Sequence, residues 1–479
     1  MAKPSEQPAS EAFGENEIAR ARLRRAAPVA GLVTRTAGEA VIAALRKRAT
    51  GVEDPERHIR AAERYAELLG RSKGALMKAG QAISFVSMGP AVSPELQSAY
   101  QAAMARLRAD APPMAPELAR ATLEVELGRP AEEVFAEFAP EPLAAASIGQ
   151  VHAARLHDGR RVAVKIQYPG VASAIAADLQ NSELLATFLG LLVGISPRRM
   201  RLDLRAVARE IGGQIRDELD YRREAANQTE FASLYRDHPF IRVPEVIDEW
   251  STGRVLVQEL VNGRRFEDAL GAPQELRDRW AEVIHRFAYG SLDHFRIFNA
   301  DPQPANYLFH DDGTVSFLDF GCVVRLSPRT AGQVIRLMGS VLREDIPGLW
   351  EAALDAGMWR PDDPVSPEEA FAYWREPNEL YLARQPFTLT PEYMPAVVER
   401  RHSPTGPSGN AMRHLNSPPD FATMGRMDLG ILSLLAELRA TGYWRAAADE
   451  FFAQAPPLSE LGRLEEPWLA EHPTAIKHA

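Results

Sequence analysis

The chain has 479 residues, 46% of them hydrophobic and 25% charged, which is typical of a globular protein with more than one domain. Its net charge of −10 argues against nonspecific binding of nucleic acid, so we expect no nucleic-acid partner. The single cysteine, Cys322, excludes an internal disulfide and a cysteine-based zinc cluster. The longest apolar run, residues 184–195, is too short to span a bilayer. We therefore expect a cytoplasmic protein.

The N-terminal part begins with a polar, acidic tail over residues 1–17, which we expect to be disordered. Residues 18–50 then carry eight basic residues against one acid, a local charge of +7, with apolar residues between them. This pattern predicts a peripheral contact with an anionic membrane surface. A surface helix with a solvated charged face fits it equally well. Helical patterning continues through residues 54–107 and 116–127, so residues 18–130 are predicted to form a helical extension.

Strand patterns follow at residues 141–147, 151–156 and 161–166, with an Asp158-Gly159 turn that predicts a hairpin. A long helix is predicted over residues 204–234, and two further strands over 242–249 and 254–260. Residues 131–262 are thus expected to form a small lobe with a five-stranded antiparallel sheet.

The chain then becomes mainly helical. A helix is predicted over residues 273–295, followed by two short strands at 306–309 and 315–318 around the turn at Gly313. Further helices are expected after Ser327, with a loop at 402–420 and a closing helical block at 427–452. We expect residues 263–452 to form a large helical lobe and residues 453–479 to be a tail. The predicted fold class is α+β and bilobal.

The residues most suggestive of chemistry lie in the large lobe. Asp301 and Asn306 form a D-x₄-N run, and Asp319-Phe320-Gly321 follows after the predicted hairpin. Phosphoryl chemistry on ATP needs Mg²⁺, which a kinase binds with one carboxylate and one amide oxygen, while another carboxylate lies near the attacking group. A common turn after a strand would explain Asp319-Phe320-Gly321 by itself. It would not explain why the Asp301–Asn306 run and a hairpin precede this triplet.

The predicted small lobe carries residues that match the phosphate-binding parts of a kinase. Lys165 lies on the alternating strand Val-Ala-Val-Lys-Ile, where a kinase places the lysine that contacts the α- and β-phosphates. Two strands earlier, a run of small residues replaces the glycine-rich phosphate loop: Ala144, Ala145, Ala146 and Ser147. The segment 218–227 contains three acids, Glu218, Asp220 and Glu224, with helical spacing that puts Asp220 and Glu224 on neighbouring faces.

Together with Lys-x-Gly-Gln at residues 78–81, these motifs resemble the UbiB (AarF-like) family of atypical kinases, which includes proteins that support isoprenoid-quinone biosynthesis. The resemblance implies a protein-kinase-like fold and roles for single residues. Lys78 and Gln81 would fold over the nucleotide site, held by Glu218 and Asp220. Glu224 would pair with Lys165. The segment 257–260, with Glu259 and Leu260, would receive adenine through backbone groups.

The same resemblance makes Asp301 the catalytic-loop aspartate and assigns Asn306 and Asp319 as metal ligands. The family commonly has His-Ala-Asp-Pro-His-Pro-Gly-Asn where this chain has residues 299–306, so Asn299, Gln303 and Ala305 are departures. An amide cannot shuttle protons near pH 7, which puts turnover in more doubt than binding.

Three functions remain open at this stage. The first is a Mg²⁺-dependent ATPase that supports isoprenoid-quinone or lipid metabolism at a membrane surface, in contact with lipid-biosynthesis enzymes. The second is a phosphotransferase acting on a small-molecule or protein hydroxyl. The third is a nucleotide-binding pseudokinase scaffold. All three require ATP, and the first two require Mg²⁺.

Overall fold

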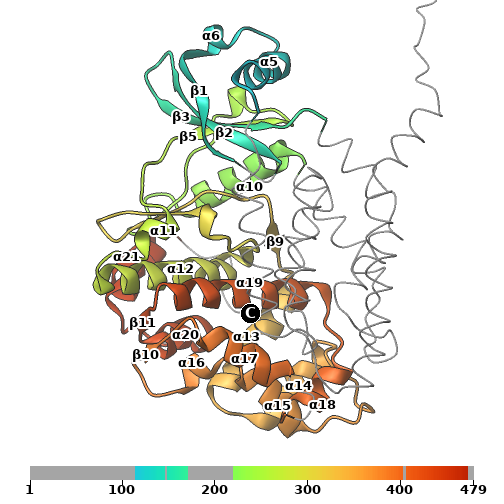
Figure 1. Cartoon of the computed structure of the whole chain (residues 1–479). Coiled ribbons are helices and arrows are strands. Elements are labelled where there is room, and N and C mark those ends of the chain that lie inside the picture. The colour runs from blue at the N-terminus through green and yellow to red at the C-terminus, as the bar shows by residue number, and fades with distance from the viewer. Residues whose placement is uncertain (1–113, 146–147, 171–218, 403–405, 473–479) are drawn as a thin grey trace, which may run out of the picture.

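The computed structural model describes residues 114–145, 148–170, 219–402 and 406–472, and two regions are visible in it (Figure 1). A sheet region occupies one end of the molecule and a mainly helical region the other. The predicted tail 1–17 and the basic segment 18–50 lie outside the described residues.

The sheet region is built on four antiparallel strands in the order β1-β2-β3-β5. These are β1 (Phe135–Ala145), β2 (Gly149–Leu156), β3 (Arg161–Gln167) and β5 (Val255–Glu259). The predicted hairpin turn joins β2 to β3, with Gly159 at a positive φ of 90° that a side chain would disfavour.

The prediction of a fifth strand in this sheet is wrong. Only Val246 forms a bridge to β5, at Gln258, although Ile247 N–H also donates to Val257 O at 2.8 Å. Pro244 lies inside the predicted strand and has no N–H to donate to a ladder. The residues before it form β4 (Ile241–Arg242), which pairs with a strand of a second, three-stranded sheet. The segment therefore crosses between the two sheets.

Helix α5 (Pro116–Leu127) belongs with the sheet, although the sequence placed it in the N-terminal extension. Its buried side chains Ala119 and Leu123 pack in one apolar cluster with Val162, Val164 and Ile166 of β3. The short helix α6 (Ala131–Val134) continues this cluster. The sheet is thus covered on one face by residues that precede it in the chain.

The helical region is arranged around α12 (Gln274–Phe295), whose buried residues face several neighbours at once. The remaining helices are α10 (Tyr221–Leu234), α11 (Phe266–Ala269), α13 (Pro328–Leu342), α14 (Ile346–Asp355), α15 (Pro367–Arg375), α16 (Glu379–Leu382), α17 (Tyr393–His402), α18 (Gly409–His414), α19 (Pro419–Glu437), α20 (Trp444–Ala453) and α21 (Glu460–Glu471), with the 3₁₀ turns η1 (Asp248–Trp250) and η2 (Pro304–Asn306). Helices α13–α20 lie on the side of α12 that faces away from the sheet, with α19 and α20 packed against it (Figure 1).

Small strand pairs lie between the two regions. The predicted hairpin is present as β7 (Tyr307–Phe309) and β8 (Val315–Phe317), and β4 joins β8 in parallel. Strand β6 (Ile297–Asn299) pairs with β9 (Val323–Arg325). The strands place residues 299–306 beside residues 318–323.

Two predictions for the C-terminal part need correction. The helical block at 427–452 is interrupted by β11 (Thr441–Gly442), which pairs with β10 (Phe387–Thr388), and the predicted loop 402–420 contains α18. Gly442 lies so close to the Trp444 ring that a Cβ there would be 2.9 Å from it. A helical pattern does not reveal such a contact.

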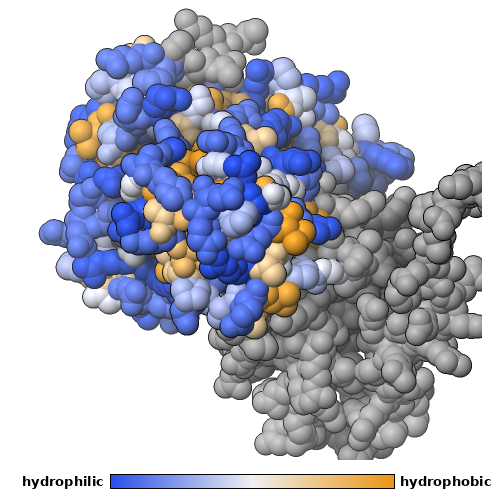
Figure 2. Space-filling view, turned by 90° about the horizontal axis from the view of Figure 1, so that it is seen from above, coloured by the Kyte–Doolittle hydropathy of each residue, from blue (hydrophilic) through white to orange (hydrophobic). Residues whose placement is uncertain are grey.

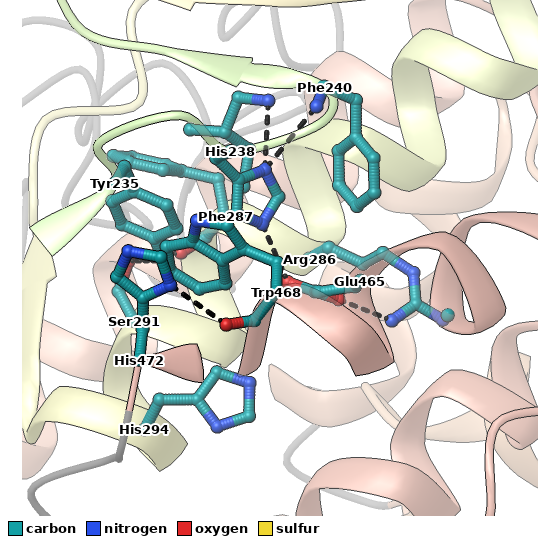
Figure 3. Close-up of polar contacts among 12 residues, drawn as sticks. Tyr235, His238, Phe240, Arg286, Phe287, Ser291, His294, Glu465, Trp468 and His472 are labelled. Atoms are coloured by element: carbon teal, nitrogen blue, oxygen red, sulfur yellow. Dashed lines mark hydrogen bonds and ion pairs between the residues drawn. The ribbon is translucent and has the colours of Figure 1, made fainter. Parts of the chain in front are cut away.

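The segment expected to be a tail contains α21, which packs into the core of the helical region. Glu465 of α21 is 2% exposed and lies between Arg286 and His238 (Figure 3). Arg286 Nη1 donates to Glu465 at 2.8 Å, and the same guanidinium contacts Glu282 and Glu450. Trp468 stacks on Tyr235 nearby. Buried charge therefore holds the last helix in place.

The surface seen from the sheet end is mainly hydrophilic, with small apolar areas separated by polar residues (Figure 2). None of the helices in the described ranges is both long enough and apolar enough to cross a bilayer.

Replacing Arg286 with methionine should lower the free energy of unfolding by about 3–5 kcal/mol, because Glu465 and Glu450 would stay buried without their cation. Urea denaturation measures this loss. The control is Arg336→Met, which removes the exposed contact with Asp355 and should leave the free energy of unfolding nearly unchanged. Equal losses in the two variants would show that the buried network is not what secures α21.

Candidate functional site

Lys165 occupies the face of β3 that is turned away from α5. Val162, Val164 and Ile166 alternate with it and belong to the apolar cluster beneath α5. Because successive side chains on a strand point to opposite faces, Lys165 is directed towards α10 and the boundary with the helical region. The sequence therefore places one cation on an inner strand of the sheet, on the face opposite its apolar neighbours.

The ammonium of Lys165 contacts two carboxylates that are far apart in the chain. It lies 2.7 Å and 2.9 Å from the two carboxylate oxygens of Glu224, and 3.0 Å from Oδ2 of Asp319. The side chains of Lys165 and Glu224 are 12% and 6% exposed, whereas Asp319 is 32% exposed. Glu224 is thus enclosed, and Asp319 is the member that solvent reaches most easily.

These charges control the protonation of the lysine. Burial alone lowers the pKa of Lys165, but the neighbouring Asp319 and Glu224 outweigh it and raise the pKa well above its usual value. Lys165 is therefore a cation at every physiological pH. A cation between carboxylates in a water-poor position is suited to contact an anion that displaces one of them.

Helix α10 supplies Glu224, and its start corrects a prediction. The helix begins at Tyr221 and not near residue 204, because Leu219 and Asp220 are not helical. Asp220 is the N-cap, and its carboxylate accepts from Arg222 N–H at 3.1 Å. The prediction that Asp220 and Glu224 lie on neighbouring faces of one helix is therefore wrong for Asp220, which precedes the helix. Glu218 lies outside the described residues, as does the remainder of the predicted helix, 204–217.

The structure describes only the two ends of the alanine-rich loop, up to Ala145 and from Ile148. Ala144 and Ala145 end β1, opposite Val151 and Gln150, whereas Ala146 and Ser147 lie outside the described residues. Gly149 opens β2 so close to β3 that a Cβ would lie 2.2 Å from Ile166 O. This glycine is required for strand packing. The border of the loop is therefore fixed to the strand that carries Lys165.

The two residues expected to contact adenine, Glu259 and Leu260, already use their N–H groups. Glu259 N–H donates to Glu245 O at 2.8 Å, and Leu260 N–H donates to Arg161 O at 3.0 Å. Neither can donate to a base without breaking a bond of the sheet region. Any adenine contact at these two residues would have to use their carbonyl oxygens.

Asp301 and Asn306 are held together on the loop after β6. Asn306 Nδ2 donates to Asp301 O at 3.1 Å and lies 3.4 Å from Asp301 Oδ2. This orientation turns Asn306 Oδ1 away from Asp301. The loop rests on α19, where a Cβ on Gly430 would lie 2.3 Å from Pro302 Cγ.

Asn306 and Asp319 lie on adjacent backbone segments, because Leu318 N–H donates to Asn306 O at 3.0 Å. Asp319 Oδ1 accepts from Gly321 N–H at 2.9 Å, which fixes the carboxylate. An amide oxygen and a carboxylate form a donor set that fits Mg²⁺, which completes its shell with water and phosphate. Within the described ranges, no group of three or more His, Cys, Asp or Glu could hold a metal without such additional ligands.

Asn299 has a positioning role that the sequence did not reveal. Its Nδ2 donates to Asp319 O at 2.5 Å, and its Oδ1 accepts from Asp301 N–H at 3.1 Å. One amide thus connects the Asp301 loop to the Asp319 segment with both of its ends. The sequence signalled this residue only by its departure from the histidine common in the family. Its two backbone partners, Asp319 O and Asp301 N–H, are known only from the fold.

The structure brings together Lys165, Glu224 and Asp319, and separately Asp301 with Asn306. Lys78 and Gln81 lie outside the described residues, so their predicted contact with this site stays a prediction.

Known proteins match the chain over this region. The model of the ABC1 atypical kinase-like domain matches residues 106–353, about half of the chain. The mitochondrial atypical kinase COQ8B of Rattus norvegicus is 38% identical over 262 residues, which cover 54% of this chain and 47% of that protein. The mitochondrial atypical kinase coq-8 of Caenorhabditis elegans is 36% identical over 54% of this chain and 34% of its own length. The chain thus spans less than half the length of these curated relatives.

A solved structure is similar over a larger share of the chain. It is the complex of Rv3197 with erythromycin from Mycobacterium tuberculosis, with a TM-score of 0.60 and 28% sequence identity. The similarity covers 87% of this chain and all of that one.

Replacing Lys165 with methionine should lower the free energy of unfolding by about 3–5 kcal/mol at pH 7.5, because the buried Glu224 carboxylate loses its ion-pair partner. Urea denaturation measures this loss.

The matched control is the double variant Lys165→Met, Glu224→Leu, which replaces the pair with apolar groups and should recover most of the loss. A deficit in Lys165→Met that persists in the double variant would contradict this account of the pair.

Proposed function

The chain belongs to the ABC1 atypical kinase-like family, and on that premise we propose that it is a Mg²⁺-dependent ATPase. We propose further that it supports isoprenoid-quinone or lipid metabolism at a membrane surface. The proposal combines what the family resemblance implies with the local geometry around Lys165.

The observation that carries the proposal is the contact of one buried ammonium with both Glu224 and Asp319. The contact with Glu224 fixes the lysine on the sheet, and the contact with Asp319 directs it towards the Asp301–Asn306 loop. A triphosphate bound between them would meet the lysine from one side and the oxygen ligands from the other. This arrangement supports binding of a metal-complexed nucleotide.

Each residue has a role in this proposal. Lys165 would donate to α- and β-phosphate oxygens, while Glu224 keeps the ammonium in position. Asn306 Oδ1 and the Asp319 carboxylate would hold Mg²⁺, which supplies neutralisation of the phosphate charge. Asp301, tied to Asn306 by the amide contact, would orient the attacking water. Asn299 would hold the backbones of Asp301 and Asp319 in a fixed relative position through its two hydrogen bonds.

The cellular role is the more distant part of the proposal. In the family that the motifs resemble, the alanine-rich loop goes with weak kinase activity and favours ATP hydrolysis. The basic segment 18–50 would supply contact with anionic lipid, and lipid-biosynthesis enzymes would be the protein partners.

The test measures phosphate release and thermal stabilisation with ATP and Mg²⁺ in the full chain, with and without anionic liposomes. The wild-type protein should release phosphate from ATP, and the rate of release should be higher when anionic liposomes are present. Asp319→Asn should reduce the rate by about a hundredfold or more, because the metal loses its carboxylate. The control is Asp311→Asn, at an exposed carboxylate in the β7–β8 turn that contacts Arg264, and it should behave as wild type.

Other outcomes lead to different functions. Stabilisation by nucleotide without phosphate release, in wild type and Asp319→Asn alike, would indicate a pseudokinase scaffold. Transfer of labelled phosphate to an acceptor would indicate a phosphotransferase. A wild-type protein that neither binds ATP nor releases phosphate would overturn the proposal.

A further inference from the structure

Tyr221 is the first residue of α10 and contacts three parts of the site region. Its backbone N–H donates to Gly253 O at 3.1 Å, in the turn before β5. Its ring lies under the Lys165 ammonium, with 5.0 Å from Nζ to the ring centre. Its hydroxyl lies against Gly149, 3.0 Å from where a Cβ of that residue would be. The phenol therefore fills the space between the lysine and the border of the alanine-rich loop.

The hydroxyl of this tyrosine is buried and has no hydrogen-bond partner among the described residues. Tyr221 is 0% exposed, and its hydroxyl has no hydrogen-bond partner within residues 114–145, 148–170, 219–402 and 406–472. Buried hydroxyl groups normally have a partner, because burial without one sacrifices the hydrogen bonds made to water. A phenylalanine would fill the same space and keep the ring under Lys165 without this cost. The hydroxyl therefore calls for a partner in another state of the protein.

The surroundings indicate the chemistry of that partner. The hydroxyl is next to Gly149, where the loop expected to cover phosphates ends, and the ring of the same residue contacts the lysine expected to bind them. An un-ionised phenol offers an O–H donor, and an anionic oxygen is the acceptor that forms the strongest bond with it.

We propose that Tyr221 is a further ligand-binding residue of this site, whose hydroxyl donates a hydrogen bond to a phosphate oxygen of the bound nucleotide. The inference rests on the proposed nucleotide binding and adds a residue to it. Before nucleotide binds, the hydroxyl is unsatisfied, and the phosphate satisfies it. Tyr221 then discriminates nucleotides with phosphates from the free nucleoside.

Tyr221→Phe tests the proposal, because it removes only the hydroxyl and keeps the ring. Without nucleotide, the melting temperature should equal or exceed that of wild type. The dissociation constant for ATP with Mg²⁺ should rise by about ten- to a hundredfold, the loss expected for a hydrogen bond to a charged group. The dissociation constant for adenosine should not change. Calorimetric titration of the full chain measures both constants.

Tyr235→Phe is the matched control, because Tyr235 is also buried and lies at the other end of α10. Its hydroxyl is 2.6 Å from Ser291 Oγ, so it already has a hydrogen-bond partner in the core of the helical region (Figure 3). This variant should lower the melting temperature without nucleotide and leave both dissociation constants unchanged.

Three results would overturn the inference while leaving ATP binding intact. They are an unchanged ATP constant in Tyr221→Phe, an equal loss for adenosine, and a fall in the nucleotide-free melting temperature like that of Tyr235→Phe. The last would mean that the hydroxyl already has a partner within the chain. A wild-type protein that binds no ATP would instead overturn the proposed function, and this inference with it.

Discussion

The arrangement of the site depends on one largely buried ammonium that is held by carboxylates from two distant segments. Lys165 connects the sheet to α10 through Glu224, and to the segment after β8 through Asp319. Taking charge out of water is costly, so such a cluster persists only when the partners stay close. The sheet, α10 and the segment after β8 are therefore held in one relative position. A ligand that replaces one of the carboxylates at Lys165 removes one of the contacts that hold them.

Other contacts extend this constraint to the loops. Gly149 allows β2 to approach β3 closely, and Gly430 allows the Asp301 loop to rest on α19. Asn299 connects the backbones of Asp301 and Asp319 through a neutral amide, which keeps its hydrogen bonds across the physiological pH range. These contacts are short and use backbone atoms, so the site residues are fixed by neighbours that take no part in the chemistry.

Much of the fold followed from local patterns, because the alternation in β3 and the turns at Gly159 and Gly313 are determined by neighbours in sequence. The fifth strand was overpredicted, since apolar alternation in residues 242–249 hides the effect of Pro244. Helix α21 lies in residues that were expected to be a tail, and prolines at 456, 457 and 467 obscure its helical pattern. The contacts that fix it, such as Arg286 with Glu465, join residues 179 positions apart, and no local pattern reveals a pair at that separation.

The dependence of α12 on α21 also bears on how the protein is made. Arg286 is translated long before Glu450 and Glu465, and until they emerge from the ribosome its guanidinium lacks two of its three carboxylate partners. Domains generally fold as units during synthesis, from the N-terminal end. Here the helical region reaches its complete core only after synthesis of α21, and a nascent chain paused before residue 465 lacks the carboxylate that joins Arg286 to His238.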